Sequence, residues 1–290
     1  MVALSRRWRI MKVGLGLPIS DLPSLLTWAR RAEAGPFTTL GLLDRIVYDN
    51  PEPMVTLAAI AAATTRIRVQ TEVLLAPLRE PVLLAKQSAT LDRMSGGRLT
   101  LGVGVGARPE DFLAVGADYA MRGRRVDEMM PVLKRIWSGR PYGDQVGAIG
   151  PAPARENGPE LLFGGFVPAA LKRVARWGDG YLSATPVERS DQLFRTAEKE
   201  WAVAGRAGRP RLVGQVNVVL GPQSVVEDAK QAIDSYYASL AGTYEVHMVT
   251  TADQIRSAIS GFADLGADEV MLYCWAHDPD QVDRLADLVA

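Results

Sequence analysis

Short apolar segments alternate with amphipathic segments along the whole chain, and this alternation constrains the fold more than any other feature. The apolar segments have the length and composition of buried strands, and the segments between them carry apolar residues at helical spacing. Strands are predicted at residues 12–17, 38–43, 67–75, 98–103, 160–163, 180–183, 211–220 and 269–274. Helices are predicted at residues 21–32, 53–65, 81–94, 122–137, 168–177, 189–204, 224–240, 251–265 and 279–289.

Strands that alternate with helices over short links pair in parallel, through right-handed crossovers. Eight such strands in 290 residues are typical of one α/β domain, the (β/α)8 TIM barrel. An open doubly wound sheet is the alternative, but no G-x-G-x-x-G motif follows the first strand. We therefore expect a single barrel domain over residues 1–290. Residues 1–10 are expected to form an N-terminal arm, and residues 107–121 and 139–159 to form insertion loops.

Charge and cysteine content exclude several classes of partner. The chain has 33 basic and 33 acidic residues, so nothing indicates binding to nucleic acid or to a membrane surface. The aliphatic run at residues 54–63 is too short to span a bilayer. Cys274 is the one cysteine, which rules out an intramolecular disulfide and favours the cytoplasm. The two histidines lack a nearby ligand motif, so no metal site is expected.

The fourth predicted strand ends in glycines at alternate positions, Gly102, Gly104 and Gly106. Side chains at alternate positions of a strand point the same way, so one face of this strand end is bare. A flat group could approach the backbone there. A tight strand exit that packs against a neighbour is the other interpretation of the same glycines.

In a barrel of this kind the active face gathers the carboxyl ends of the strands. Three residues at those ends are candidates for a substrate pocket. Tyr48 and Trp275 would either wall the pocket or pack in the core, and His277 would either face the substrate or lie in a surface loop.

A longer set of motifs resembles the luciferase-like family of flavin- and deazaflavin-dependent oxidoreductases. It includes Thr65-Arg66-Ile67, Pro77 to Pro81, Ala85-Lys86-Gln87, Leu91-Asp92, Ser95 to Leu99, Gly102-Val103-Gly104, Arg124 to Glu128, Trp137-Ser138-Gly139, Phe163-Gly164-Gly165 and Gly178-Asp179-Gly180. The resemblance implies a bacterial-luciferase-like (β/α)8 barrel with insertion segments. It also implies FMN or coenzyme F-420 at the strand ends, a small-molecule substrate and a homodimer.

The resemblance assigns roles to particular positions. Asp44 is similar to the acid that faces the ring, and Arg45 stands where F-420 members usually carry His. The remaining cofactor contacts implied are Val73, Gly104, Val105 and Gly106 beside the ring, the backbone of Gly164, Gly165 and Phe166, and the hydroxyls of Ser183 and Thr185 at the phosphate.

The third strand carries a specific expectation from the same resemblance. A non-prolyl cis peptide bond is expected between Glu72 and Val73, against the ring. Glu72 would then be an acid on this bulge, with either a catalytic role, beside Asp44 and Arg45, or a structural one.

Two departures from the family pattern bear on the cofactor. Val105 stands near the place where luciferases proper carry an Arg for the FMN phosphate, which favours F-420. Arg45 cannot act as an acid or base near neutral pH, but it could anchor an anion. The preferred hypothesis is F-420-dependent hydride transfer. An FMN-dependent monooxygenase and a non-catalytic cofactor-binding barrel are the alternatives.

Overall fold

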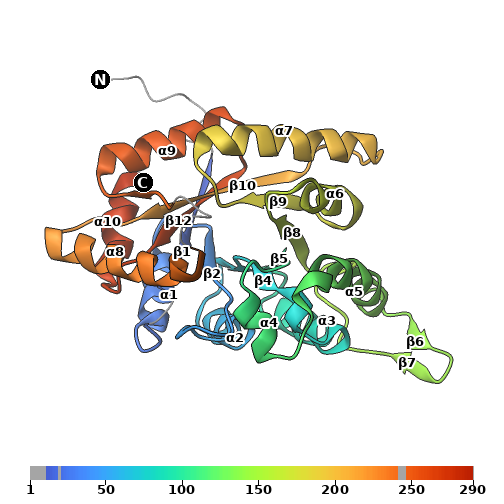
Figure 1. Cartoon of the computed structure of the whole chain (residues 1–290). Coiled ribbons are helices and arrows are strands. Elements are labelled where there is room, and N and C mark those ends of the chain that lie inside the picture. Colours follow the sequence, from blue (N-terminus) through green and yellow to red (C-terminus); the bar gives the residue numbers. More distant parts are fainter. Residues whose placement is uncertain (1–10, 19–20, 241–245, 290) are drawn as a thin grey trace.

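The computed structural model describes residues 11–18, 21–240 and 246–289, and within them the chain forms a closed parallel barrel wrapped by helices (Figure 1). Around the barrel, each strand pairs in parallel with the next, and β9 closes the ring against β10. The predicted (β/α)8 barrel is confirmed. The barrel strands are β1 (Lys12–Gly16), β2 (Thr39–Leu42), β3 (Arg68–Thr71), β5 (Leu99–Gly104), β8 (Glu160–Gly164), β9 (Gly180–Ser183), β10 (Arg211–Val218) and β12 (Glu269–Cys274).

The helices that cover the barrel begin where the sequence offers a start signal. Pro53 and Pro81 occupy the first turns of α2 and α3, where a missing N–H costs nothing, and the side chains of Glu52 and Glu80 cap them. The helices are α1 (Leu25–Ala34), α2 (Pro53–Ala63), α3 (Pro81–Met94), α5 (Arg122–Trp137), α6 (Pro168–Trp177), α7 (Val187–Val203), α8 (Gln223–Tyr237), α9 (Ala252–Asp264) and α10 (Asp280–Val289).

The two segments expected as insertion loops contain secondary structure. Residues 107–121 hold helix α4 (Pro109–Ala114) and the short η2 (Tyr119–Met121), which differs from the expected loop. The helix forms because Pro109 opens it and two acids lie in its first turn. Residues 139–159 hold the antiparallel strands β6 (Pro141–Gly143) and β7 (Val146–Ala148), which extend away from the barrel beside α5 (Figure 1). The expected N-terminal arm, residues 1–10, lies outside the described residues.

The third barrel strand is interrupted at the expected place. After β3 the chain passes through Glu72 and Val73 and resumes as β4 (Leu74–Leu75), and both pieces pair with β5. The peptide bond between Glu72 and Val73 is cis, so the predicted non-prolyl cis bond is confirmed. The short η1 (Ala76–Leu78) follows and leads into α3.

A ring of charged side chains fills the barrel at the amino ends of the strands. Arg68 and Arg211 both bond to Glu160, at 2.9 and 2.5 Å, and Arg211 also pairs with Glu269. Burial would raise the pKa of Glu160, but the attraction of the two guanidinium groups outweighs it and holds the pKa below its usual value. The carboxyl ends of the strands form the other end of the barrel, which we call the mouth. No helix in the described ranges is long and apolar enough to cross a membrane.

Candidate cofactor site at the barrel mouth

The bare face of the glycine strand is filled, which corrects the expectation that a flat group could lie directly on its backbone. A Cβ at Gly102 would overlap the carbonyl oxygen of Thr71, and one at Gly104 would overlap Cγ2 of Val73. The glycines therefore make room for the bulge between β3 and β4. The reason is spatial: the Val73 side chain lies in front of Gly104, at the top of β5.

Val73 forms the platform at the mouth. Its Cγ1 lies 3.0 Å from the position of a Cβ on Gly164 in β8, so the side chain spans from β5 to β8. Below it, four buried apolar side chains fill the barrel: Leu162, Leu182, Val213 and Met271. Val73 itself is partly exposed, as are Val105 and Gly106.

Asp44 is buried at the end of β2 with both carboxylate oxygens engaged. Arg79 donates to Oδ2 at 2.5 Å and to Oδ1 at 3.1 Å, and the backbone N–H of Leu75 donates to Oδ2 at 2.7 Å. The carboxylate therefore fixes the chain just after the bulge. Nothing in the sequence around Asp44 pointed to Arg79 as its partner.

Arg45 is also committed to internal contacts. Its Nε donates to Asp111 at 2.8 Å and its Nη2 donates to Glu110 at 3.2 Å, and its side chain is 4% exposed. Asp111 further accepts hydrogen bonds from the backbone N–H groups of Ile46 and Val47. This acid ties α4 to the loop after β2. Sequence reasoning missed it, although two acids directly after the glycine strand were a usable signal.

An aromatic cluster lines one side of the mouth. The rings of Tyr48 and Tyr236 lie 5.3 Å apart, and those of Tyr236 and Trp275 also lie 5.3 Å apart. Trp275 is buried and donates from Nε1 to Oδ1 of Asn217 at 2.9 Å. Tyr48 and Trp275 thus lie on the same cluster, and Tyr236, which was not predicted from the sequence, packs between them. His277 is exposed beyond the end of β12.

Arg108 joins this cluster from the segment that follows β5. Its Cζ lies 4.5 Å from the centre of the Tyr236 ring, and its Nη2 donates to the Tyr236 carbonyl oxygen at 2.9 Å. A guanidinium over a tyrosine face is attracted by the ring quadrupole. The contact fastens the start of α4 to the end of α8 across the mouth.

Three buried hydroxyl groups cluster at the end of β9. Ser183 Oγ lies 2.9 Å from Thr185 Oγ1 and 2.8 Å from Ser190 Oγ, and the last two lie 2.9 Å apart. The structure brings Ser183 and Thr185 together and adds Ser190, the fourth residue of α7. Hydroxyl groups both donate and accept, so such a cluster can reorient toward an anion.

The amino end of α6 lies in the same corner. Val167, at its N-cap, supplies no side-chain cap, but Pro168 has no N–H and the Ala170 N–H donates to the Val167 carbonyl oxygen at 2.9 Å, which leaves the N–H of Ala169 in this turn for an anion. The loop before it contains Gly165, with φ of +132°, whose carbonyl oxygen accepts from Tyr181 Oη in β9 at 2.9 Å. Arg189 lies over the Phe166 ring, with Cζ 5.3 Å from its centre. Gly164, Gly165 and Phe166 are half-buried at the mouth.

Glu72 is buried inside the barrel under the mouth. Gln70 donates to its Oε1 at 2.8 Å, and its Oε2 has no hydrogen-bond partner among the described residues. Burial raises the pKa of Glu72 to about 8; the Gln70 bond opposes this shift and the charge of Glu269 adds to it. Burial therefore disfavours the charged form of this side chain.

A cavity of about 430 Å³ opens beside the hydroxyl cluster. The upper part of β10 leaves β9 there and pairs with β11 (Met248–Val249), and α9 covers the gap. The polar residues that line it are Thr185, Glu188, Gln215, Asn217, Tyr237, His247, Gln254 and Ser257. Within the described chain this lining contains no lysine or arginine, so it suits a neutral polar group better than a polyanion.

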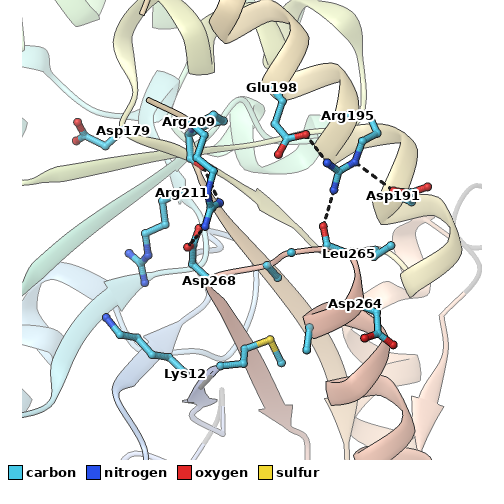
Figure 2. Close-up of a pocket in the computed structure, with 15 residues that line it drawn as sticks. Lys12, Asp179, Asp191, Arg195, Glu198, Arg209, Arg211, Asp264, Leu265 and Asp268 are labelled. Carbon is cyan, nitrogen blue, oxygen red and sulfur yellow. Dashed lines mark hydrogen bonds and ion pairs between the residues drawn. The ribbon is translucent and has the colours of Figure 1, made fainter. Parts of the chain in front are cut away.

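A larger cavity, of about 1050 Å³, opens at the opposite face of the barrel (Figure 2). Lys12 and Arg211, the first residues of β1 and β10, belong to its lining, so it surrounds the amino ends of the strands. Figure 2 shows Arg195 bonded to Glu198, and this ion pair is one of several between charged residues that line the cavity. Barrel enzymes act at the carboxyl ends of the strands, which favours the mouth as the functional site.

The residues at the mouth fit a flat ring that carries a phosphate. The platform of Val73 is apolar, the hydroxyl cluster and α6 amino end form a corner for an anion, and Glu72 Oε2 is an unpaired polar atom beneath them. In contrast, the described residues contain no group of His, Cys, Asp and Glu that could hold a metal ion.

Comparisons with known proteins identify the family of the chain. The family model described as luciferase-like monooxygenase matches residues 10–270. An uncharacterized protein of Mycobacterium tuberculosis is 30% identical over 200 residues, covering 59% of this chain and 69% of that protein. The 4-hydroxyprotoasukamycin monooxygenase of Streptomyces nodosus subsp. asukaensis is 28% identical, covering 75% of this chain and 67% of the enzyme.

The fold is shared with solved structures of lower identity. An F420-dependent secondary alcohol dehydrogenase, solved in complex with an F420-acetone adduct, superposes with a TM-score of 0.80 at 19% identity. The superposition covers 96% of this chain and 98% of that chain. With the family model matching nearly the whole barrel, the chain belongs to the luciferase-like monooxygenase family of oxidoreductases.

Proposed function

We propose that the protein binds coenzyme F-420 at the mouth and catalyses hydride transfer to or from a small organic substrate. The observation that carries the proposal is the bulge at Glu72 and Val73, which builds a platform at the same end of the barrel as the hydroxyl cluster and the α6 amino end. A platform beside an anion corner is what a flat redox ring with a phosphate requires. When bound, the deazaflavin ring supplies the hydride chemistry, with a carbonyl, imine or alkene as partner.

Each group of residues at the mouth has a proposed part. Val73, with Gly104, Val105 and Gly106 beside it, supports the ring. The backbone of Gly164, Gly165 and Phe166 and the hydroxyls of Ser183 and Thr185 hold the phosphate. Asp44 acts by fixing the chain after the bulge through Leu75, and Arg45 acts by fixing α4 through Asp111.

The aromatic cluster bounds the remaining space and excludes water from it. Tyr48 and Trp275 would form the wall next to the substrate, with His277 at the rim. The cavity between β9, β10 and α9 lies beyond Asn217, the residue that orients the Trp275 indole. A neutral substrate with polar groups fits that space, since its lining offers amides and hydroxyls.

The charge of the phosphate favours F-420 over FMN. The phosphomonoester of FMN carries about −1.5 to −2 charges at pH 7, whereas a phosphodiester, as in F-420, carries a single one. The corner offers neutral hydroxyls and N–H groups with Arg189 nearby, and Val105 brings no further cation. This donor set matches a single negative charge.

Titration of the purified protein with each cofactor tests the proposal. Fluorescence of F-420 should change on binding with a Kd in the low micromolar range or below, and FMN should bind more weakly. Tight binding of FMN without F-420 binding would contradict the choice of cofactor. Binding of neither would leave only the barrel fold and would reject the proposed function.

An FMN-dependent monooxygenase is the second candidate. The observation that favours it is the similarity over 75% of this chain to an enzyme named as a monooxygenase. Oxygen consumption in the presence of reduced FMN and a range of small substrates distinguishes the two. Cofactor binding without turnover of any kind would support the third reading, a non-catalytic cofactor-binding barrel.

Two further proposals concern the state of the protein in the cell. A homodimer is proposed from the family resemblance, and light scattering of the pure protein checks it. A location in the cytoplasm is proposed from the single, buried Cys274, and fractionation of the source cells checks it.

A further inference from the structure

The barrel wall opens at its carboxyl end, between β9 and β10. The register of these two strands ends with Ser183 beside Gly214, and β10 continues from there beside β11 and β12. The cavity of about 430 Å³ lies at this opening, because Ala184 and Thr185, directly after β9, and residues 215–217 of β10 all line it.

The cavity has lining residues on both faces of β10. A Cβ on Gly214 would lie 2.4 Å from the Phe262 ring of α9, so this position faces outward, toward the helices. Since successive residues of a strand face opposite sides, Gln215 faces the lumen and Val216 faces outward. Val213, two positions before Gln215, belongs to the apolar cluster against which the Val73 platform packs. Gln215 is therefore the next lumen-facing residue of β10 toward the mouth, and the cavity reaches from it to α9.

Gln215 is buried with its side-chain amide unpaired. The residue is 8% exposed, lines the cavity and makes no side-chain hydrogen bond to any other described residue. Asn217, the next residue on the same face, differs: its Oδ1 accepts from Trp275 Nε1 at 2.9 Å, and its Nδ2 donates to the His247 carbonyl oxygen at 3.1 Å. Buried amides are normally paired, because an unpaired one costs free energy. The amide of Gln215 is thus available to a ligand in the cavity.

The rest of the lining decides which kind of group Gln215 can bind. Among the described residues it includes no lysine or arginine, and its one acid, Glu188, is exposed, so an anion would meet no opposite charge. A glutamine side chain both donates and accepts, and a carbonyl beside an N–H pairs with both of its polar atoms at once. The remaining walls are largely apolar and include two rings: Val187, Val216, Tyr237, Val249, Ala258 and Phe262.

We propose that this cavity recognises an uncharged amide carried on a flat apolar body, and that Gln215 is the residue that determines this specificity. The inference rests on the proposed function, because it takes the cavity as the part of the substrate site that adjoins the mouth. Gln215 Nε2 donates to the amide oxygen and Gln215 Oε1 accepts from the amide N–H. The amide is held and does not react, and the reacting end of the substrate lies at the mouth.

Three naphthalene probes of nearly the same shape test the preference in the full-length protein. 2-Naphthamide carries the uncharged amide, 2-naphthoate carries an anion, and 2-acetonaphthone carries a carbonyl without an N–H. Isothermal titration calorimetry gives the Kd of each. 2-Naphthamide should bind about tenfold more tightly than 2-naphthoate and several-fold more tightly than 2-acetonaphthone, which is the worth of one or two net hydrogen bonds.

Q215M tests the residue itself, because methionine keeps the length of the side chain and removes both polar atoms. Its Kd for 2-naphthamide should rise about tenfold, and the preference over 2-acetonaphthone should disappear. Q231M is the matched control, since Gln231 is exposed on α8, and it should bind all three probes as wild type does. A general disturbance of the fold weakens the three probes alike, whereas lost recognition changes the ratio of their Kd values.

The outcomes separate this inference from the proposed function. Equal binding of the three probes to wild type, no binding of 2-naphthamide at millimolar concentration, or an unchanged preference in Q215M would each overturn the inference. Binding of F-420 by the same protein would then leave the proposed function standing. A preference for the amide that is lost in Q215M, in a protein that binds neither F-420 nor FMN, would reject the proposed function and support the role of Gln215.

Discussion

Arg79 clamps Asp44 at the barrel mouth through two hydrogen bonds, and the pair is almost wholly shielded from water: Asp44 is 1% exposed and Arg79 14%. Removing one partner of a buried pair leaves an uncompensated charge, which costs about 3–5 kcal/mol. R79A should therefore lower the free energy of unfolding by that amount, measured in urea. R124A, which breaks an exposed pair on α5, should change it by less than about 0.5 kcal/mol. If R79A and R124A lower the free energy of unfolding equally, the buried Asp44–Arg79 pair stabilises the fold no more than an exposed pair does.

Gly104 should not tolerate a side chain, because Val73 already fills the space in front of it. G104A forces Val73 and the bulge to move, so we expect a loss of about 1–3 kcal/mol in stability and a clear loss of cofactor affinity. Truncating Val73 makes room, so the double variant G104A/V73A should recover stability relative to G104A. G147A is the control, since nothing lies within 4 Å of a Cβ at that position. If G104A/V73A is no more stable than G104A, the predicted clash between Val73 and a side chain at position 104 is contradicted.

The hydroxyl cluster should affect only ligands with a phosphate. T185V removes one member of the cluster and should weaken binding of FMN or F-420 by about tenfold, the worth of one charge-assisted hydrogen bond. Binding of riboflavin, or of the deazaflavin that carries only the ribityl chain, should not change, because neither carries a phosphate. T196V, in which the lost hydroxyl bonds to a carbonyl oxygen within α7, serves as the control. A similar loss for riboflavin would mean that Thr185 supports the fold and not the phosphate.

Glu33 should make the fold sensitive to acid. Its partial burial opposes ionisation, but hydrogen bonds from the backbone of Thr65, Ile67 and Arg66 and from the Thr65 hydroxyl prevail and lower its pKa to about 2. A lowered native pKa contributes stability above the unfolded value of about 4.5, and that stability is lost as the pH falls toward 2.

E33Q should therefore reduce the unfolding free energy at pH 7 by about 1–2 kcal/mol, a modest value because solvent screens this partly exposed group. The difference between E33Q and wild type should shrink as the pH falls from about 4.5 to 2. A difference that stays constant with pH would show that the carboxylate charge is not the cause.

The barrel was predictable from local pattern, because each strand and helix carries its own periodicity and its own start and stop residues. Residues 180–183 and 269–274 were predicted as strands and are strands with those same ends. The ends are sharp since Gly180 and Glu269 follow polar turns and the chain beyond each strand leaves the barrel. The cis bond after Glu72 came from the family resemblance, because no propensity of Glu or Val indicates it.

Tertiary structure alone decided what the mouth residues do. Arg45 bonds to Asp111, which is 66 positions away in the sequence. The guanidinium group that was expected to anchor an anion therefore holds α4 against the loop after β2. Thr71 and Val73 fill the face that Gly102 and Gly104 leave bare, and burial in the closed barrel raises the pKa of Glu72. Sequence determines which residues can form each strand and helix, since those forces act over a few residues. Which charges become paired, which atoms stay unpaired and which acids stay neutral depends on distances and burial that exist only once the barrel has closed.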